Sequence, residues 1–144
     1  TGGTSITILG PGPGPRGPVG PEGPSGSTTF AKKSSGAVSG HRVVRSTDGT
    51  HIDYCDANTL AHRDICLGIT TNAASAAEQD VTVVWQGEIE EGSWSWTPGL
   101  PIFCGPNGVL TQTFSSLWAW SRVVAFAESA TKILVQLREP IQLI

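Results

Sequence analysis

The chain has few charged residues and little excess of either sign, which limits the partners that electrostatics can attract. Charged side chains make up 15% of its 144 residues, and the net charge is −3. There is no basic stripe, so we predict no binding to nucleic acid. The apolar runs are too short to span a membrane, and no signal peptide is visible, so we also predict no membrane insertion.

Sequence motifs that carry catalysis are missing as well. There is no GxSxG elbow for a nucleophilic serine and no glycine loop leading into a helix that would cradle a phosphate. Glu88, Glu90 and Glu91 precede Trp94, and paired carboxylates near tryptophan can hydrolyse glycosides. The flanking Gly87 and Gly92 favour a solvated turn instead. We therefore predict a non-enzymatic protein without cofactors, with a polysaccharide depolymerase as the remaining enzymatic alternative.

Metal-binding spacings such as HxH, HExxH and CxxC are also absent. His51 and Asp53 would share a strand face, but a site needs two or three converging ligands. We predict no metal site within one protomer; a ring of histidines on a three-fold axis is the alternative, which His41, His51 or His62 could supply.

Cysteine is scarce, and its number is odd. Cys55, Cys66 and Cys104 favour buried free thiols in a protein made in a reducing cytoplasm. The alternative is one disulfide and one leftover thiol.

What the sequence does have is a glycine period near its start. Glycine falls at every third position from 14 to 26, and proline follows the first four of these glycines; the positions are Gly14, Gly17, Gly20, Gly23 and Gly26. This is the Gly-X-Y pattern of a collagen triple helix, in which only glycine fits at the axis. The pattern predicts a homotrimer, and the alternative is a stiff polyproline linker in a single chain. Five triplets are too few to hold three chains, so the head should drive trimerisation.

The period divides the chain into four expected parts. Residues 1–13 form an N-terminal arm, residues 14–28 the collagen-like stem, residues 29–35 a hinge, and residues 36–144 a C-terminal head. In the arm, Thr4–Leu9 alternates β-branched residues and reads as a short strand. We predict that Ile6, Ile8 and Leu9 dock onto the edge of a neighbouring sheet, the alternative being a frayed end.

The head shows strands separated by turns. Val38–Ser46 and His51–Asp56 flank a turn signal at Thr47–Thr50, which predicts a hairpin with Ile52 and Tyr54 on one face. Gly68 should mark a bulge or a close approach within a strand at Ile65–Thr71. Further strands are expected at Val81–Gly87, Leu100–Cys104, Val109–Thr113, Val123–Ala127 and Ile133–Arg138, with one more in the region Glu88–Trp96. The pattern predicts an all-β sandwich or barrel, jelly-roll-like, in a homotrimer.

Four of the five tryptophans form two pairs at i,i+2 spacing, Trp94 with Trp96 and Trp118 with Trp120. On a strand this spacing places both rings on one face. Such rings pack in the core or at a trimer interface, and the alternative is an exposed platform that binds sugar rings.

A short collagen-like stem before a compact β head resembles the fibre, decoration and cement proteins of tailed bacteriophages. The resemblance covers most of residues 36–144. It is carried by Gly40-His-Arg-Val-Val-Arg45, Asp48-Gly-Thr50, Tyr54-Cys-Asp-Ala57, His62, Leu67-Gly-Ile-Thr-Thr-Asn-Ala-Ala74, Trp96-Thr-Pro-Gly-Leu-Pro-Ile-Phe103, Gly108-Val-Leu-Thr111 and Pro140-Ile141.

This resemblance implies a homotrimer that is assembled in the bacterial cytoplasm, carried on the virion surface and attached by its N-terminal end. The function expected is therefore a structural capsid decoration or head-fibre protein, with phage capsid or tail proteins as partners of the arm. The alternative is a tail-fibre tip that recognises glycans on the host cell surface.

Overall fold

The computed structural model describes residues 28–144, which fold into strands joined by turns and two single-turn 3-10 helices. In chain order the elements are β2 (Thr28–Ser34), β3 (Val43–Ser46), β4 (His51–Tyr54), η2 (Leu60–His62), β5 (Cys66–Thr70), β6 (Asp80–Glu90), β7 (Pro101–Cys104), η3 (Pro106–Gly108), β8 (Leu110–Thr111), β9 (Trp120–Ser121), β10 (Val123–Ala127), β11 (Lys132–Gln136) and β12 (Ile141–Gln142). The all-β prediction is confirmed for this part of the chain. The arm and the glycines at 14–26 lie outside the described residues.

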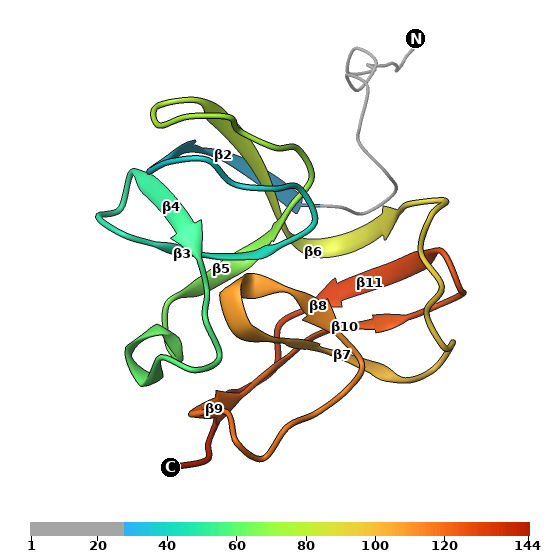
Figure 1. Ribbon diagram of the computed structural model, residues 1–144. Helices are drawn as coiled ribbons and strands as arrows, with labels where there is room; N and C mark the ends of the chain where they lie inside the picture. Colours follow the sequence, from blue (N-terminus) through green and yellow to red (C-terminus); the bar gives the residue numbers. More distant parts are fainter. Residues whose placement is uncertain (1–27) are drawn as a thin grey trace, which may run out of the picture.

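Nine strands form one sheet that curls into a barrel (Figure 1). Five of them close a ring in the order β2-β4-β3-β5-β6, since β2 pairs with β4 at one edge and with β6 at the other. The other four extend from β6 in the order β11-β10-β7-β8. A separate pair, β9 with β12, lies beside the C-terminus.

The long strand β6 joins the ring to this extension. Its first half pairs with β2 and β5, and its second half, from Gln86 to Glu90, pairs with β11. Side chains alternate along a strand, so a strand with cores on both sides buries consecutive residues. Val83 and Val84 are buried in this way, Val83 in the ring and Val84 beneath the extension.

Two apolar cores result from this arrangement. The smaller fills the ring and contains Val38, Val44, Ile52, Ala74, Val81 and Val83. The larger lies between the ring and the extension, and Trp120, Ile102, Ile133 and Val124 are among its fully buried members. At about 25 cal/mol per Å² of apolar surface removed from water, such burial is the main favourable term in folding.

The predicted hairpin is confirmed. β3 and β4 pair antiparallel, with Ser46 opposite Ile52, and Ile52 and Tyr54 both pack on the ring core. In the turn, the Asp48 carboxylate accepts hydrogen bonds from the backbone N–H groups of Thr50 and His51 at 2.9 and 2.8 Å. Gly49 has a φ of 90°, which favours glycine.

The structure differs from the sequence predictions in two connecting regions. Thr28–Ser34, most of which was predicted as a hinge, forms β2, whose backbone pairs with β6 over nearly its whole length. Glu88 and Glu90 lie within β6 and not in a turn, because β11 pairs with them across the sheet. Both errors came from reading small, polar or glycine-flanked segments as breaks, when backbone pairing with a distant strand overrides those local preferences.

The winding of the sheet also differs from the jelly-roll-like expectation. The nine strands belong to one continuous sheet, and four of its nine pairings join strands that are consecutive in sequence, namely β3–β4, β5–β6, β7–β8 and β10–β11. The barrel alternative is therefore the one observed, since one sheet closes on itself and two separate sheets do not pack as in a jelly roll.

Gly68 shows both of the features predicted for it, a bulge and a close approach to the neighbouring strand. The register between β3 and β5 shifts there, since Val44 pairs with Gly68 and Arg45 with Cys66. A Cβ atom at Gly68 would overlap the backbone carbonyl oxygen of Val84 on the neighbouring strand. Only a residue without a side chain allows β5 to approach β6 this closely.

We therefore predict that Gly68→Ala lowers the free energy of unfolding by about 1–3 kcal/mol, the usual cost of overpacking. Urea denaturation measures this as a lower midpoint. Gly92→Ala is the matched control, because its Cβ would meet nothing within 4 Å and its midpoint should hardly move. Equal midpoints for the two variants would contradict the close approach at Gly68.

Candidate functional site

The second tryptophan pair is packed inside the protomer. Trp120 is fully buried, and its indole N–H donates to the backbone carbonyls of Thr59 and Asp56 at 2.8 and 3.1 Å. Trp118 is 7% exposed and packs edge-on against Phe103 and Phe114, with ring centroids 6.4 and 5.9 Å away. Neither ring forms an open platform for a sugar.

The first pair is half-buried. Trp94 and Trp96 pack against the larger core, and their ring centroids lie 5.7 Å apart. Trp94 also contacts the imidazole of His41 at 4.9 Å. The indole N–H of Trp96 is buried without a hydrogen-bond partner. Both residues belong to the segment between β6 and β7, so they close the side of the larger core.

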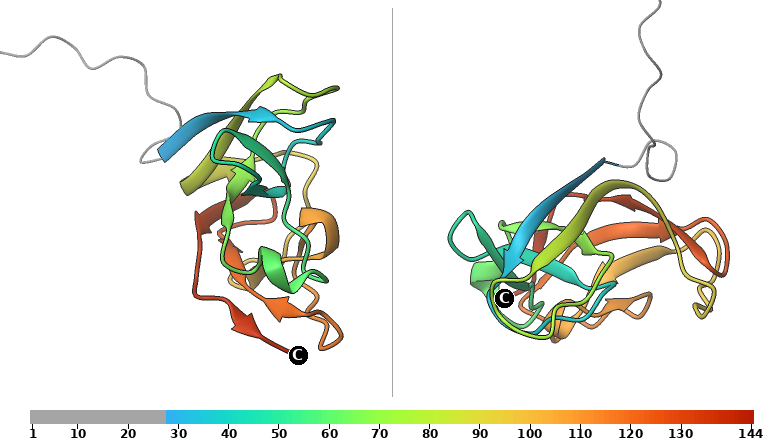
Figure 2. Two further views of the ribbon diagram at one scale, coloured as in Figure 1. Left: turned by 90° about the vertical axis from the view of Figure 1, so that its left-hand side faces the viewer. Right: turned by 90° about the horizontal axis from the view of Figure 1, so that it is seen from above.

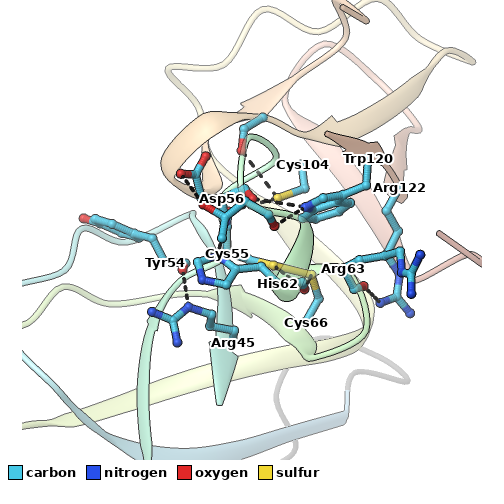
Figure 3. The surroundings of a disulfide bond; sticks show 12 residues. Arg45, Tyr54, Cys55, Asp56, His62, Arg63, Cys66, Cys104, Trp120 and Arg122 are labelled. Atoms are coloured by element: carbon cyan, nitrogen blue, oxygen red, sulfur yellow. Dashed lines mark hydrogen bonds between the residues drawn. A yellow bond between two sulfur atoms is a disulfide. The ribbon is translucent and has the colours of Figure 1, made fainter. Parts of the chain in front are cut away.

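Cys55 and Cys66 form a disulfide that joins the end of β4 to the start of β5 (Figure 3). Their Cα atoms are 6.1 Å apart, and 11 positions separate them in the sequence. The expectation of three free thiols is thus wrong, and the alternative of one disulfide with a leftover thiol is the one observed. Cys104 is the remaining thiol; burial raises its pKa, which makes it a poor nucleophile.

The segment between the two disulfide cysteines is held by the backbone around η2. The N–H of Asp56 donates to Nδ1 of His62 at 3.0 Å, and the Asp56 carboxylate accepts from the Thr59 hydroxyl at 3.1 Å. Figure 3 shows Asp56 and His62 between the disulfide and Trp120 on one side and Tyr54 and Arg45 on the other. Burial, and after it the positive charge of Arg45, lowers the pKa of His62. The cluster thus has a structural role in ordering the loop, and its imidazole is bound to backbone.

His51 lies in a different environment. Its two ring nitrogens contact the carboxylates of Glu78 at 2.7 Å and Asp48 at 2.9 Å. The hydrogen bond to Glu78, followed by the one to Asp48, raises the pKa of His51. The pairing ties the hairpin turn to the segment before β6. The predicted strand-face partner Asp53 is not among these contacts.

Within residues 28–144, no three histidine, cysteine or acidic side chains converge in a way that could hold a metal ion. The same residues contain no helix of the length and apolar character needed to cross a membrane. The predicted stem glycines at 14–26 and the arm residues Ile6, Ile8 and Leu9 fall outside this part of the chain, so their roles stay predictions.

Exposed apolar side chains occur at several places on the head, including Ile65, Leu100, Val109, Ile141 and Ile144, and two surface regions contain the others. One, which we call the stem-side face, comprises Trp85, Gln86, Pro101, Val123, Phe126, Gln136 and Leu137 on the outer surface of β6, β11, β10 and β7, with Trp85 43% exposed. The other, the distal loop, is the segment 112–119, where Phe114 is 47% and Leu117 89% exposed. In the left view of Figure 2 the start of β2 lies on the left side of the head and the distal loop at its lower right.

Sequence reasoning missed Trp85, since it belongs to neither i,i+2 pair. Its exposure comes from a β-bulge: Thr28 pairs with Gln86 and Thr29 with Val84, which leaves Trp85 as the extra residue. A bulge turns a side chain away from its regular alternation. The only local signal was Gly87 two residues later, whose φ is 120°.

Comparison with solved structures finds one likeness. The chain is similar to the N base of the head fibre gp8.5 of bacteriophage phi29. The two share 13% sequence identity with a TM-score of 0.44, over 76% of this chain and 93% of that one. No protein-family model and no curated protein sequence matches the chain.

The disulfide gives a direct chemical prediction. Alkylation of the unfolded, unreduced chain should add one label, at Cys104, and alkylation after reduction should add three. Mass spectrometry counts the labels. Reduction should also lower the free energy of unfolding by about 2–3 kcal/mol for a loop of this length. Three labels on the chain before reduction would show that the bond does not form.

The two histidines predict opposite pH dependences. His51 has a raised pKa, so its stabilising effect is full below the unfolded value of about 6.5 and is lost as the pH rises through the folded pKa. His62 has a lowered pKa, so its effect is full above about 6.5 and is lost as the pH falls through the folded pKa.

Urea midpoints of wild type, His51→Gln and His62→Gln, measured at about pH 5 and about pH 8 on either side of the histidine range, test this. The deficit of His51→Gln should be larger at the lower pH, and that of His62→Gln larger at the higher pH. If the two deficits change with pH in the same direction, one of the two environments is wrong.

Proposed function

We propose that the chain is a non-enzymatic structural protein of a bacteriophage virion, a trimeric capsid decoration or head-fibre protein. Residues 1–13 attach it to the capsid, the collagen-like stem projects it from the surface, and the β head forms an outward knob. Three copies of the chain assemble through the stem and head. Its place is the virion surface, after assembly in the bacterial cytoplasm.

The observation that carries the proposal is the direct connection of the glycine period to the folded head. Gly26 is the last glycine in register, and Thr28 already belongs to β2. A single residue, Ser27, therefore separates a three-chain motif from a paired strand. Because there is no linker long enough to dissociate them, the head must be compatible with the three-fold symmetry of the stem.

Two features of the head favour a projecting knob over an enzyme. The conspicuous titratable groups of the described residues bind backbone or pair with each other, as His62 does with the Asp56 N–H and His51 with Glu78 and Asp48. The Cys55–Cys66 disulfide also suits a protein displayed outside the cell, since disulfides persist on virion surfaces.

Removal of residues 1–13 tests the attachment. The full chain and the shortened chain are each mixed with phage capsids that lack the protein, and capsid-bound protein is measured after sedimentation. We expect the full chain to bind and the shortened chain to remain folded in solution but unbound. Equal binding by both chains would contradict an anchoring role for the arm.

The second candidate is a tail-fibre tip that recognises host cell-surface glycans, and the exposed Phe114 and Leu117 of the distal loop favour it. The same proteins decide between the candidates when they are mixed with host cells. A receptor-binding tip would adsorb to cells without its arm and would lose adsorption in Phe114→Ser. A capsid protein would show neither behaviour.

A further inference from the structure

The connection at Thr28 places strong geometric limits on a trimer. In a triple helix each in-register glycine lies at the common axis. Two residues of extended chain reach about 7 Å at most, so Thr28 must lie within about that distance of the axis once Gly26 does. This step rests on the proposed function, because it takes the glycine period to form a triple helix. Whatever surrounds Thr28 on the head must then face its two symmetry copies.

The stem-side face begins at Thr28. Thr28 pairs with Gln86 of β6, and Gln86 also pairs with Gln136 of β11. A residue in a strand has one cross-strand partner on each side, so Gln86 lies between its two partners. Thr28, Gln86 and Gln136 are therefore side by side on three neighbouring strands, about 5 Å from one to the next. The left view of Figure 2 shows the start of β2, the middle of β6 and β11 along one side of the head.

This face is hollowed and apolar. Trp85, Gln86, Gln136 and Leu137 line a hollow of about 230 Å³ beside Thr28. Gln136 also borders a second hollow of about 320 Å³, which Pro101, Val123 and Phe126 line over β7 and β10. Since the two hollows share Gln136, they form one continuous surface. A half-exposed tryptophan beside shallow hollows is typical of the centre of a protein–protein interface.

The residues nearest Thr28 are uncharged, and the nearest acidic group is Glu88, two positions beyond Gln86 on the same face of β6 and opposite Leu134 of β11. A three-fold axis repeats every charge near it three times, and like charges in contact are unfavourable. Thr28, Trp85, Gln86 and Gln136 are uncharged, and the one charged side chain bordering the hollows, Arg138, donates to the Gln136 amide oxygen at 3.0 Å. At the opposite end of β2, Lys33 pairs with Asp80 at 2.8 Å.

We infer that the stem-side face is the three-fold interface of the head, and that its occupants are two further copies of this chain. The bulge at Trp85 directs the indole toward the neighbouring copy. Gln86 and Gln136 provide amide groups that can donate and accept across the interface. The larger hollow receives apolar side chains of that copy, and the distal loop stays free at the far end.

Substitution of Trp85 tests the interface in the full chain. Light scattering should give wild type a mass of about 45 kDa, three times the chain mass of 15.0 kDa, and Trp85→Glu a threefold lower mass. Leu117→Glu is the matched control on the distal loop and should remain trimeric. Circular dichroism and urea midpoints check that both variants fold.

Cysteine cross-linking gives an independent readout in case Trp85→Glu fails to fold. Thr28→Cys, Gln86→Cys and Leu117→Cys introduce single exposed thiols, while the buried Cys104 and the disulfide should not react with a flexible bismaleimide. We expect Thr28→Cys and Gln86→Cys to give covalently linked chains and Leu117→Cys to give none.

The outcomes distinguish a failure of the inferred interface from a failure of the proposed trimer. If wild type is trimeric and Thr28→Cys cross-links but Gln86→Cys does not, the stem lies on the axis and another face forms the interface. If Trp85→Glu folds and stays trimeric without Gln86→Cys cross-links, the inferred face is likewise wrong while the trimer stands. A monomeric wild type would overturn the proposed trimer and the interface together.

Discussion

The change of buried face along β6, from the ring core to the larger core, is the constraint on which the rest of the head depends. A strand beside one core alternates buried and exposed residues, and it must bury two consecutive residues where it changes the face that it buries. Val83 and Val84 meet that requirement, and each contributes to a different core. The ring and the extension therefore form one cooperative unit. Detaching β6 from either of them would expose the apolar residues of both cores to water. The glycine at position 68 belongs to the same constraint, since it lets β5 come close enough to β6 to close the ring.

Those strands and turns that depend on neighbouring residues could be predicted from the sequence. The β3–β4 hairpin was predictable because its turn is specified by Asp48 and Gly49, and Val123–Ala127 because β-branched and apolar residues cluster between clear turns. The long strand β6 was not, because Gly87 reads as a break, whereas in the folded chain it follows a bulge that the strand passes through. β2 was also missed. Its pairing with β6 is a contact between residues about 50 positions apart, and nothing in Thr28–Ser34 alone indicates it.

The tryptophan and cysteine sites likewise depend on contacts between residues that are far apart in the sequence. The i,i+2 spacing of Trp118 and Trp120 was visible, but their burial depends on Phe103 from β7 and on carbonyl groups at Asp56 and Thr59. The disulfide could be considered only as an alternative, since spacing does not determine whether two cysteines meet. In the fold Cys55 directly follows β4 and Cys66 begins β5. Both of these strands pair with β3, which brings the two sulfur atoms together.

The two ends of β2 differ in the side chains that surround them, and this difference relates the fold of the head to the stem. The seven residues of β2 span about 20 Å. At its end lie Lys33 with Asp80, and nearby the His51, Asp48 and Glu78 group, all paired within one protomer. At its start lie the uncharged Gln86 and Gln136 and a tryptophan that the bulge turns outward, with Glu88 next along that face of β6. Charges satisfied within a protomer suit a surface exposed to water, whereas uncharged groups suit a surface that symmetry brings against its own copies. Since the glycine period enters the head where Thr28, Gln86 and Gln136 lie side by side, the sequence pattern and the chemistry of these three residues support the same placement of the three-fold axis.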